Sequence, residues 1–320
     1  MNLAACVVSL AAVSSSLTAC SSRDGTHVAD VLETREQQVE QRIATATRSD
    51  ELQLVARWIL PRELREVSGV ALLEDGRIVV HNDERGRIYV IDPKRGVILK
   101  HFSLGDRPLH GDFEAIAVRG QDIFLLQSNG EIYRFREGGS KARVPYARYD
   151  TKLGKECEFE GLEAEPASDA LFLLCKTSSK KDERDKIVIY RWQPGNGRQP
   201  SLSLITVPVA FAAGSNDWKR LSPSDMTIDP ATGHWVIIAA REKALVELTP
   251  EGHVVRSMKL PSSLQQPEGV AITRDGLIII SDEGVKNAAD ITVFRWIPSK
   301  AEQPPATALD SATSSAASGQ

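Results

Sequence analysis

The sequence predicts an all-β fold, a single β-propeller of five four-stranded blades. The first observation is a short apolar segment that opens with an acidic or hydroxyl residue and a small residue. It recurs as SGVAL from Ser68, EAIAV from Glu114, EGLEA from Glu160, SDMTI from Ser224 and EGVAI from Glu268, at steps of 46, 46, 64 and 44 residues. The second is that a turn rich in Gly, Asp or Pro and another apolar run follow each copy. Strands and turns repeating at this interval are typical of propeller blades.

Each copy carries the strands that one blade needs. The second strands are RIVVH, IFLLQ, LFLLC, WVIIAA and LIIIS, and the third strands are RIYVID, EIYRFR, KIVIYRW, ALVELT and ITVFRW. A fourth strand follows in copies one to four, whereas copy five stops after its third. We expect residues 52–59 to supply the missing outer strand, because pairing the two chain ends removes an open sheet edge. The 64-residue step is long enough for an expanded loop (177–186) and a long connection (208–223), or for a degenerate sixth blade.

The amino terminus indicates export. Residues 1–19 are apolar and small, too short and too often interrupted by Ser for a stable membrane span, and we interpret them as a signal peptide. The tetrapeptide Leu17-Thr18-Ala19-Cys20 resembles the lipobox of bacterial lipoproteins. That resemblance implies cleavage before Cys20, acylation of its thiol with chains such as palmitate, and a lipid anchor on the periplasmic side of the bacterial cell envelope. Ser21 favours the outer membrane by the convention of that family. The alternative is an ordinary secretory signal with an incidental Cys.

The remaining boundaries follow from composition. Residues 20–50 form a tether, in which helix formers between Val28 and Ala44 favour a short solvated helix or a flexible segment. The propeller domain spans 51–299. Residues 300–320 have almost no large apolar side chains and are expected to be disordered.

Charge and motifs exclude several function classes. The 320 residues include 39 Lys and Arg against 43 Asp and Glu, for a net charge of −4, and no basic block occurs, so we expect no nucleic-acid partner. The sequence contains no G-x-S-x-G elbow, P-loop or G-x-G-x-x-G after a strand, and a serine hydrolase or nucleotide enzyme is unsupported. We expect a monomer.

Three stretches carry a family resemblance. They are EVSGVALLEDGRIVVHNDERGRIYVID, PSDMTIDPATGHWVIIAAREKALVELTPEGHV and PEGVAITRDGLIIISDEG. They resemble the SdiA-regulated (YjiK-like) β-propeller proteins and, more distantly, the propellers called "esterase-like activity of phytase", over about residues 52 to 297. The resemblance implies a propeller in the bacterial envelope, and it does not settle the function, because most members of the first family have no function assigned to them.

Propeller geometry predicts where the polar residues gather. The start of each first strand and the end of each second strand share a face, because the two run antiparallel. The predicted ligand-binding residues at this acidic mouth are Glu66, Ser68, Asn82, Asp83, Asp112, Lys176, Ser224, Asp225, Arg241, Asp282 and Glu283. His81 and His110 fall near the same face, and we interpret both as solvated surface residues.

Three glutamates hold the same position in their blades. Glu114, Glu160 and Glu268 should therefore point at one axis, where a hard cation such as Ca²⁺ would suit a ring of oxygen ligands. The alternative is that these glutamates accept hydrogen bonds from neighbouring blades and pair with Lys176 or Arg241. No His or Cys spacing resembles a zinc site.

Two cysteines bracket the hairpin of the third copy. Cys157 precedes its first strand and Cys175 ends its second, so antiparallel pairing can bring them together, and an oxidising periplasm would allow a disulfide. The alternative is one buried and one exposed Cys.

Two functions are consistent with these patterns. The first is a non-catalytic binding module that holds a small molecule, a glycan or an envelope protein in its acidic mouth, with Ca²⁺ as a possible cofactor. The second is a metal-assisted hydrolase of phosphate or carboxylic esters, with Lys176 and Arg241 as basic partners. A gluconolactonase-like set of Glu66, Asn82 and Asp282 fits only loosely.

Overall fold

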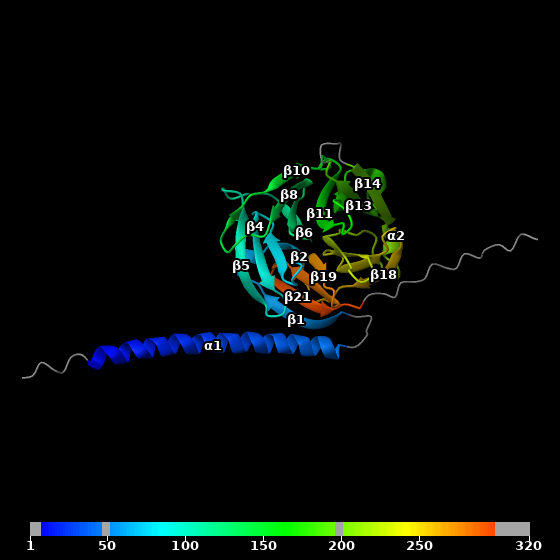
Figure 1. Cartoon of the computed structure of the whole chain (residues 1–320). Coiled ribbons are helices and arrows are strands. Elements are labelled where there is room, and N and C mark those ends of the chain that lie inside the picture. The colour runs from blue at the N-terminus through cyan, green and yellow to red at the C-terminus, as the bar shows by residue number, and fades with distance from the viewer. Residues whose placement is uncertain (1–7, 47–51, 196–200, 298–320) are drawn as a thin grey trace, which may run out of the picture.

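The chain folds into a ring of five antiparallel sheets, which we number as blades 1 to 5 in chain order (Figure 1). The computed structural model describes residues 8–46, 52–195 and 201–297. Each blade has four main strands, which confirms the predicted five-bladed propeller.

The strands of each blade run outward from the axis in chain order. Blade 1 contains β2 (Val67–Leu72), β3 (Ile78–Asn82), β4 (Arg87–Asp92) and β5 (Val97–Leu104), and β9 (Arg143–Val144) adds a short parallel edge. Blade 2 contains β6 (Phe113–Arg119), β7 (Asp122–Gln127), β8 (Glu131–Arg136) and β10 (Ala147–Asp150). Blade 3 contains β11 (Cys157–Ala164), β12 (Leu171–Ser178), β13 (Lys186–Gln193) and β14 (Ser201–Pro208). Blade 4 contains β15 (Asp225–Ile228), β16 (Trp235–Ala239), β17 (Ala244–Leu248) and β18 (Val254–Lys259).

Blade 5 closes the ring. It contains β19 (Pro267–Ile272), β20 (Leu277–Asp282) and β21 (Asp290–Arg295), and its outermost strand is β1 (Gln53–Ile59) from the other end of the domain. Trp58 of β1 pairs with Ile291 of β21, and the Arg57 guanidinium lies 2.5 Å from the Asp290 carboxylate. The predicted closure by residues 52–59 is thus confirmed.

The long step between the third and fourth copies contains no sixth blade among the described residues. Its described parts are the hairpin turn with η2 (Lys181–Glu183), strands β13 and β14, helix α2 (Val209–Ala212) and the loop that leads to β15. A further short helix, η1 (Arg62–Leu64), joins β1 to β2.

The core is divided among the five interfaces between blades. Each of the five buried apolar clusters takes residues from two neighbouring blades, as where the ring of Phe102 in blade 1 packs edge-on against that of Phe135 in blade 2. Strands buried on both faces read as continuous apolar runs, which explains why the second strands stood out in the sequence.

Small residues at the blade openings allow the inner strands to approach one another. A Cβ atom on Gly69 would lie 2.8 Å from the Ile116 backbone nitrogen of blade 2, and one on Gly269 would lie 2.6 Å from the Ser68 carbonyl oxygen of blade 1. The small residue in the repeated motif is therefore a packing requirement of a narrow ring.

Helix α1 (Val8–Thr45) lies along the outer edge of the ring beside β1 (Figure 1). Val39 is buried in the cluster between blades 5 and 1, Arg42 Nη1 donates to the Val55 carbonyl oxygen at 2.8 Å, and Glu36 pairs with Arg95 at 2.7 Å. The segment expected as a short helix or flexible tether is thus a helix whose C-terminal part is fixed to the ring.

Helix α1 also contains Cys20 and most of the expected signal peptide. Within the described part of the chain, no helix has an apolar stretch of the length needed to cross a membrane. The predicted disordered tail at 300–320 lies outside the described residues.

Candidate functional site

β-Bulges at equivalent places turn three glutamates toward the axis. The pairing of β6 with β7 shifts register between Phe113 and Ala115, and the residue inserted there is Glu114. The same shift occurs in β11 around Glu160 and in β19 around Glu268. Bulges re-aim a side chain that a regular strand would send to one of its faces, so equivalent bulges place the three carboxyl groups at one end of the channel.

Lys176 provides the cation that these glutamates share. Its Nζ lies 2.5 Å from Oε1 of Glu160, whose side chain is 4% exposed against 38% for Lys176. Burial disfavours the charged ammonium group, but the hydrogen bond and charge of Glu160, with the charges of Glu268 and Glu114, outweigh burial and raise the pKa of Lys176. We call these four residues the axial cluster.

The axial cluster holds more carboxyl groups than its one ammonium can neutralise. Burial, with the nearby charges of Glu160 and Asp112, raises the pKa of Glu114 to about 9. Burial and the charge of Glu160 raise the pKa of Glu268 to about 8. Burial also raises the pKa of Glu160, against the opposing effect of Lys176. At pH 7 the negative charge therefore resides mainly on Glu160, while Glu114 and Glu268 keep their protons.

A second carboxylate group lies where blades 1 and 5 meet. Burial and the charges of Glu66 and Glu84 raise the pKa of Asp83 to about 6. Burial, Asp83 and Glu66 raise the pKa of Glu283, which accepts a hydrogen bond from the Gln266 side chain. We call Glu66, Asp83, Glu84 and Glu283 the outer cluster. It is continuous with the axial cluster, because the charge of Glu283 also raises the pKa of Glu268.

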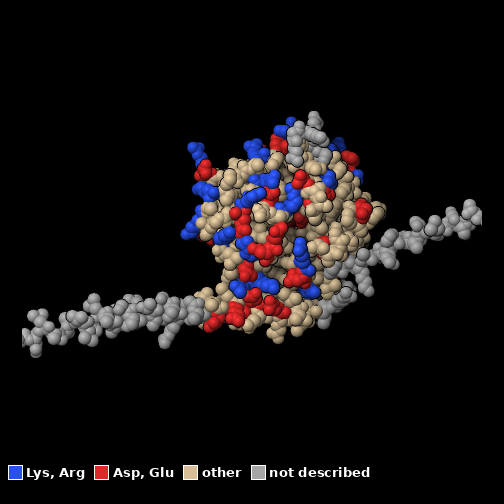
Figure 2. All heavy atoms as spheres, in the orientation of Figure 1, with Lys and Arg blue, Asp and Glu red and all other residues tan. Residues whose placement is uncertain are grey.

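The loops that carry these residues are held by backbone hydrogen bonds between blades. The Phe113 N–H donates to the Asp83 carbonyl oxygen at 2.7 Å, and the Phe159 N–H donates to the Ser128 carbonyl oxygen at 2.9 Å. Asp112 is exposed and accepts a hydrogen bond from Ser128 Oγ at 2.5 Å. Figure 2 shows acidic side chains gathered near the middle of the ring on the face in view, with basic side chains around them.

Several predicted ligand-binding residues use their polar atoms inside the protein. Ser224 Oγ donates to the Pro267 carbonyl oxygen at 2.7 Å, and the Ser68 carbonyl oxygen accepts from Ser281. Asp225 is 1% exposed and accepts from the Val270 N–H at 2.8 Å, and burial raises its pKa well above the ordinary value. Asp282 accepts from the Gln265 N–H at 2.8 Å and so holds the loop before β19. These four residues join neighbouring blades or loops.

Arg241 is exposed at the surface and forms no ion pair with any described residue. The basic residue that blade 4 turns inward is Lys243, whose Nζ donates to the carbonyl oxygens of Leu264 and Gln265. Lys243 ends the turn between β16 and β17, with φ of 50°, and the sequence prediction named Arg241 of the same turn in its place.

The interpretation of His81 as a solvated surface residue is wrong. His81 is 0% exposed, its Nε2 accepts from the Gly69 N–H at 3.2 Å, and its Nδ1 lies 3.0 Å from the Asn82 carbonyl oxygen. The missing side chain of Gly69 leaves room for the imidazole ring between two inner strands. Burial lowers the pKa of His81 to about 4, so the ring is neutral at pH 7. His110 is exposed, as expected.

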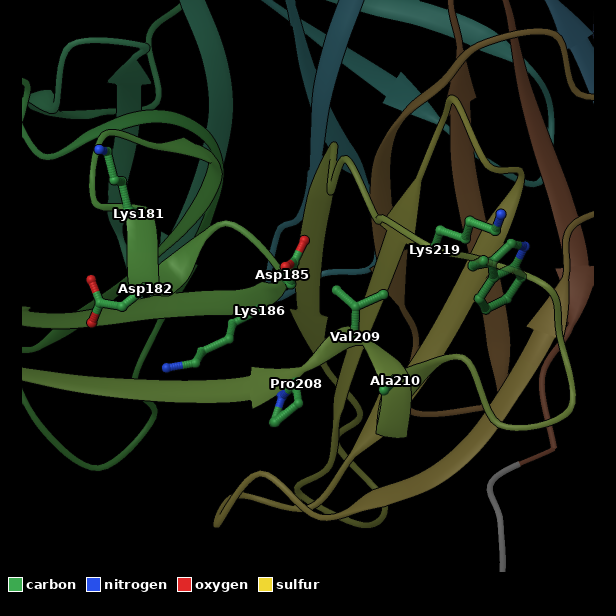
Figure 3. Close-up of a pocket in the computed structure, with 9 residues that line it drawn as sticks. Lys181, Asp182, Asp185, Lys186, Pro208, Val209, Ala210 and Lys219 are labelled. Atoms are coloured by element: carbon green, nitrogen blue, oxygen red, sulfur yellow. The ribbon is translucent and has the colours of Figure 1, made fainter.

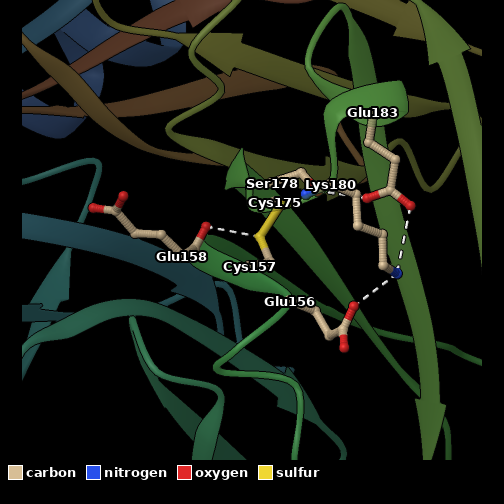
Figure 4. Close-up of a disulfide and its surroundings, with 7 residues drawn as sticks. All are labelled: Glu156, Cys157, Glu158, Cys175, Ser178, Lys180 and Glu183. Atoms are coloured by element: carbon tan, nitrogen blue, oxygen red, sulfur yellow. Dashed lines mark hydrogen bonds and ion pairs between the residues drawn. A yellow bond between two sulfur atoms is a disulfide. The ribbon is translucent and has the colours of Figure 1, made fainter.

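Cys157 and Cys175 form a disulfide between β11 and β12 (Figure 4). The adjoining hairpin is held by Lys180, which pairs with Glu156 at 2.8 Å and with Glu183 at 3.6 Å. Because Cys175 directly precedes Lys176, the disulfide fixes the strand pair that presents Glu160 and Lys176 to the channel.

Of the three glutamates expected as metal ligands, Glu160 bonds the ammonium group of Lys176, and the charges of Glu114 and Glu268 act on the same group. No group of three or more His, Cys, Asp or Glu among the described residues is arranged to hold a metal ion. A metal ion at the axial cluster would have to compete with this ammonium group for Glu160.

A pocket of about 220 Å³ lies at the edge of the mouth. It is lined by Glu66 and Asn82, both predicted ligand-binding residues, and by Arg62, Glu63, Arg65, Glu84, Arg85, Arg87 and Tyr89. The four arginines are the residues that sequence reasoning missed. They lie on two segments, before β2 and after β3, which the antiparallel pairing of these two strands brings to one place.

A larger cavity of about 590 Å³ lies away from the mouth, between η2, α2 and the loop before β15 (Figure 3). It is lined by Lys181, Asp182, Asp185, Lys186, Pro208, Val209, Ala210, Trp218 and Lys219. Figure 3 shows the charged side chains of Lys181, Asp182 and Lys186 spread apart from that of Lys219, with no common point toward which they converge. We therefore place the candidate site at the mouth.

Comparison with known proteins supports the family resemblance. The chain matches the SdiA-regulated family over residues 218–310, which include blade 4 and three of the four strands of blade 5. No curated protein sequence matches it. Among solved structures, the glutaminyl cyclase of Myxococcus xanthus is similar with a TM-score of 0.51 and 14% identity, covering 77% of this chain and 97% of the cyclase. A luciferin-regenerating enzyme is similar with a TM-score of 0.50 and 10% identity, covering 76% of this chain and 98% of that enzyme. At these identities the likeness shows the propeller fold alone.

Proposed function

We propose that this protein is a lipid-anchored binding module of the bacterial cell envelope, and that its acidic channel mouth binds a cationic ligand. The observation that carries the proposal is the excess of buried carboxyl groups over basic groups at one end of the channel. Glu114, Glu160 and Glu268 share the single ammonium of Lys176.

The outer cluster has the same excess. Oδ1 of Asp83 is buried and has no hydrogen-bond partner among the described residues. Glu66 and Glu84 are exposed beside it. Exposed carboxylates at the entrance of a low-dielectric cleft raise the local concentration of cations, and a cation that enters would lie against Asp83 and Glu283.

Binding of a cation should release protons. Glu114 and Glu268 are protonated at pH 7 because burial and mutual repulsion disfavour their ionised forms. A positive charge placed near them favours ionisation, so affinity should rise as pH rises toward 8. An ammonium or guanidinium group suits this mouth because it can donate hydrogen bonds to several carboxylates at once.

Calcium, the cofactor expected from the sequence, is one cation to be tested. It would have to use the outer cluster or displace the Lys176 ammonium from Glu160, because the axial cluster already contains a cation. An organic cation would need only the exposed carboxylates and Asp83.

The proposed location rests on the Leu17-Thr18-Ala19-Cys20 sequence, which resembles a lipobox. The disulfide between Cys157 and Cys175 is consistent with an oxidising compartment such as the periplasm. A lipid anchor on Cys20 would join the propeller through α1, which is fixed to the ring at Val39 and Arg42.

Thermal unfolding and calorimetric titration test the proposal. We expect putrescine or Ca²⁺ to raise the melting temperature at constant ionic strength, because a ligand at about 100 times its Kd stabilises the folded state by about 2.7 kcal/mol. The Asp83→Asn, Glu283→Gln double variant should lose this shift. Glu74→Gln, which changes an exposed glutamate on the turn between β2 and β3, should keep it. If neither putrescine nor Ca²⁺ raises the melting temperature of the wild type, the proposal is contradicted.

The same proteins test the alternative function, hydrolysis of phosphate or carboxylic esters. The wild type and both variants are assayed for hydrolysis of p-nitrophenyl phosphate and p-nitrophenyl acetate. If the wild type hydrolyses either ester, and Glu160→Gln loses this activity while Glu74→Gln keeps it, the protein is an enzyme and not a binding module.

A further inference from the structure

The pocket beside the mouth is lined by four arginines for which the structure gives no ion pair with any residue that it describes. Arg62, Arg65, Arg85 and Arg87 all line it. Three carboxylates line it as well, yet no ion pair of the described residues joins any of the four guanidinium groups to a carboxylate within 4.0 Å. Elsewhere on the ring arginines do pair, as Arg77 does with Glu137 at 2.6 Å.

The segments that carry these arginines are held in place. Arg65 Nε donates to the Gly284 carbonyl oxygen at 2.9 Å, and its Nη2 donates to the Val285 carbonyl oxygen at 3.2 Å. The backbone of Arg85 forms a β-bridge with His110, and the Gly86 N–H donates to the Leu109 carbonyl oxygen at 2.9 Å. The Arg65 guanidinium is therefore held against the loop after β20, and the backbone at Arg85 is held against the loop before β6.

Size and chemistry limit what the pocket can bind. A volume of about 220 Å³ is smaller than the 300 to 1,000 Å³ typical of sites for drug-sized ligands, so it suits one compact group. Planar guanidinium groups match the oxygen spacing of phosphate and donate two parallel hydrogen bonds to it. The exposed Glu63, Glu66 and Glu84 would accept hydrogen bonds from hydroxyl groups attached to that phosphate.

We propose that this pocket binds a phosphomonoester group, with Arg62 and Arg65 on one side and Arg85 and Arg87 on the other. The pocket shares Glu66 and Glu84 with the outer cluster, whereas Asp83 and Glu283, against which the proposed cation would lie, do not line it. The phosphate group can belong to a soluble phosphate ester or to a lipid headgroup.

Calorimetric titration of the full chain with glycerol 3-phosphate tests the site. We expect saturable binding that weakens at least tenfold in the Arg62→Gln, Arg87→Gln double variant and that competes with inorganic phosphate. Arg274→Gln, an exposed arginine on the turn between β19 and β20, is the control and should bind as the wild type does. Arg85→Gln, at an exposed position, provides a second variant if half-buried Arg87 is needed for folding.

Dihexanoyl phosphatidic acid distinguishes the two sources of phosphate. Tighter binding of this short-chain lipid than of glycerol 3-phosphate identifies a lipid headgroup, and equal or weaker binding identifies a soluble ester. The proposal is overturned if the wild type binds neither glycerol 3-phosphate nor the lipid. It is also overturned if the arginine variants bind both compounds with the affinity of the wild type. The putrescine titration of the same variants reports on the cation site alone, so failure of one site is distinguishable from failure of the other.

Discussion

Replacing Glu268 by Gln should stabilise the protein by an amount that grows with pH. The pKa of Glu268 is raised from 4.5 to about 8 in the folded chain, chiefly by burial. Near pH 4 the carboxyl is protonated in both the folded and unfolded states, and the substitution has little effect. As pH rises, the unfolded chain ionises first, so this glutamate favours unfolding by about 1.4 kcal/mol per pH unit until the folded form also ionises near pH 8. Gln has nearly the same shape and cannot ionise.

Glu268→Gln should therefore raise the free energy of unfolding by up to about 3 kcal/mol at pH 7 and up to about 5 kcal/mol above pH 8. Urea unfolding of wild type and variant between pH 4.5 and 8.5 measures it, without added cations. Glu74→Gln provides the control, since its exposed side chain should give a difference near zero at every pH. Parallel stability profiles of wild type and Glu268→Gln would refute the reasoning, because they would mean that Glu268 ionises normally in the folded protein.

Three further predictions concern the parts that hold the site. Lys176→Met should lower the free energy of unfolding at pH 7 by about 2 kcal/mol, because it leaves Glu160 without its partner. The loss is smaller than for a fully buried pair, because Lys176 is partly exposed. If urea unfolding gives the same free energy for the variant and the wild type, the ion pair with Glu160 does not contribute to stability. Replacing both Cys157 and Cys175 by Ser, which opens a link across a sequence separation of 18, should cost about 3 kcal/mol and remove the effect of dithiothreitol on the melting temperature. Gly69→Ala should cost about 2 kcal/mol, because its Cβ would meet the backbone of blade 2, whereas Gly139→Ala, with open space around it, should be nearly neutral in the same thermal unfolding assay.

The repeat in the sequence was sufficient to predict the ring. Apolar second strands are buried on both faces between neighbouring blades, so each reads as an uninterrupted run that is easy to recognise. Closure by residues 52–59 followed from counting strands, since the fifth copy lacked an outer strand and the segment before the first copy had no partner. The equivalent positions of Glu114, Glu160 and Glu268 also followed from the repeat.

Features that depend on contacts between distant segments could not be predicted in this way. The burial of His81 depends on the space left by Gly69 in the neighbouring strand, and a histidine at a strand end gives no sign of this in the sequence. The docking of α1 depends on two apolar residues in a largely polar segment, Val39, which is buried between blades 5 and 1, and Ile43, which packs against the same cluster.

The arginine pocket was missed for a different reason. Arg62 and Arg87 are 25 positions apart in the sequence, and neither belongs to the repeated motif that directed attention to the mouth. The antiparallel pairing of β2 with β3, in which Val67 lies opposite Asn82, brings their segments together.

Counting the protons released when a cation binds tests the central claim most directly. Calorimetric titration of the wild type with putrescine at pH 7, in two buffers with different heats of ionisation, gives that count. If the mouth binds cations through carboxyl groups that are protonated beforehand, binding should release protons from the wild type and release none from the Glu114→Gln, Glu268→Gln double variant. Binding without proton release, or equal release from both proteins, would show that the axial carboxyl groups are not the groups that respond to the ligand.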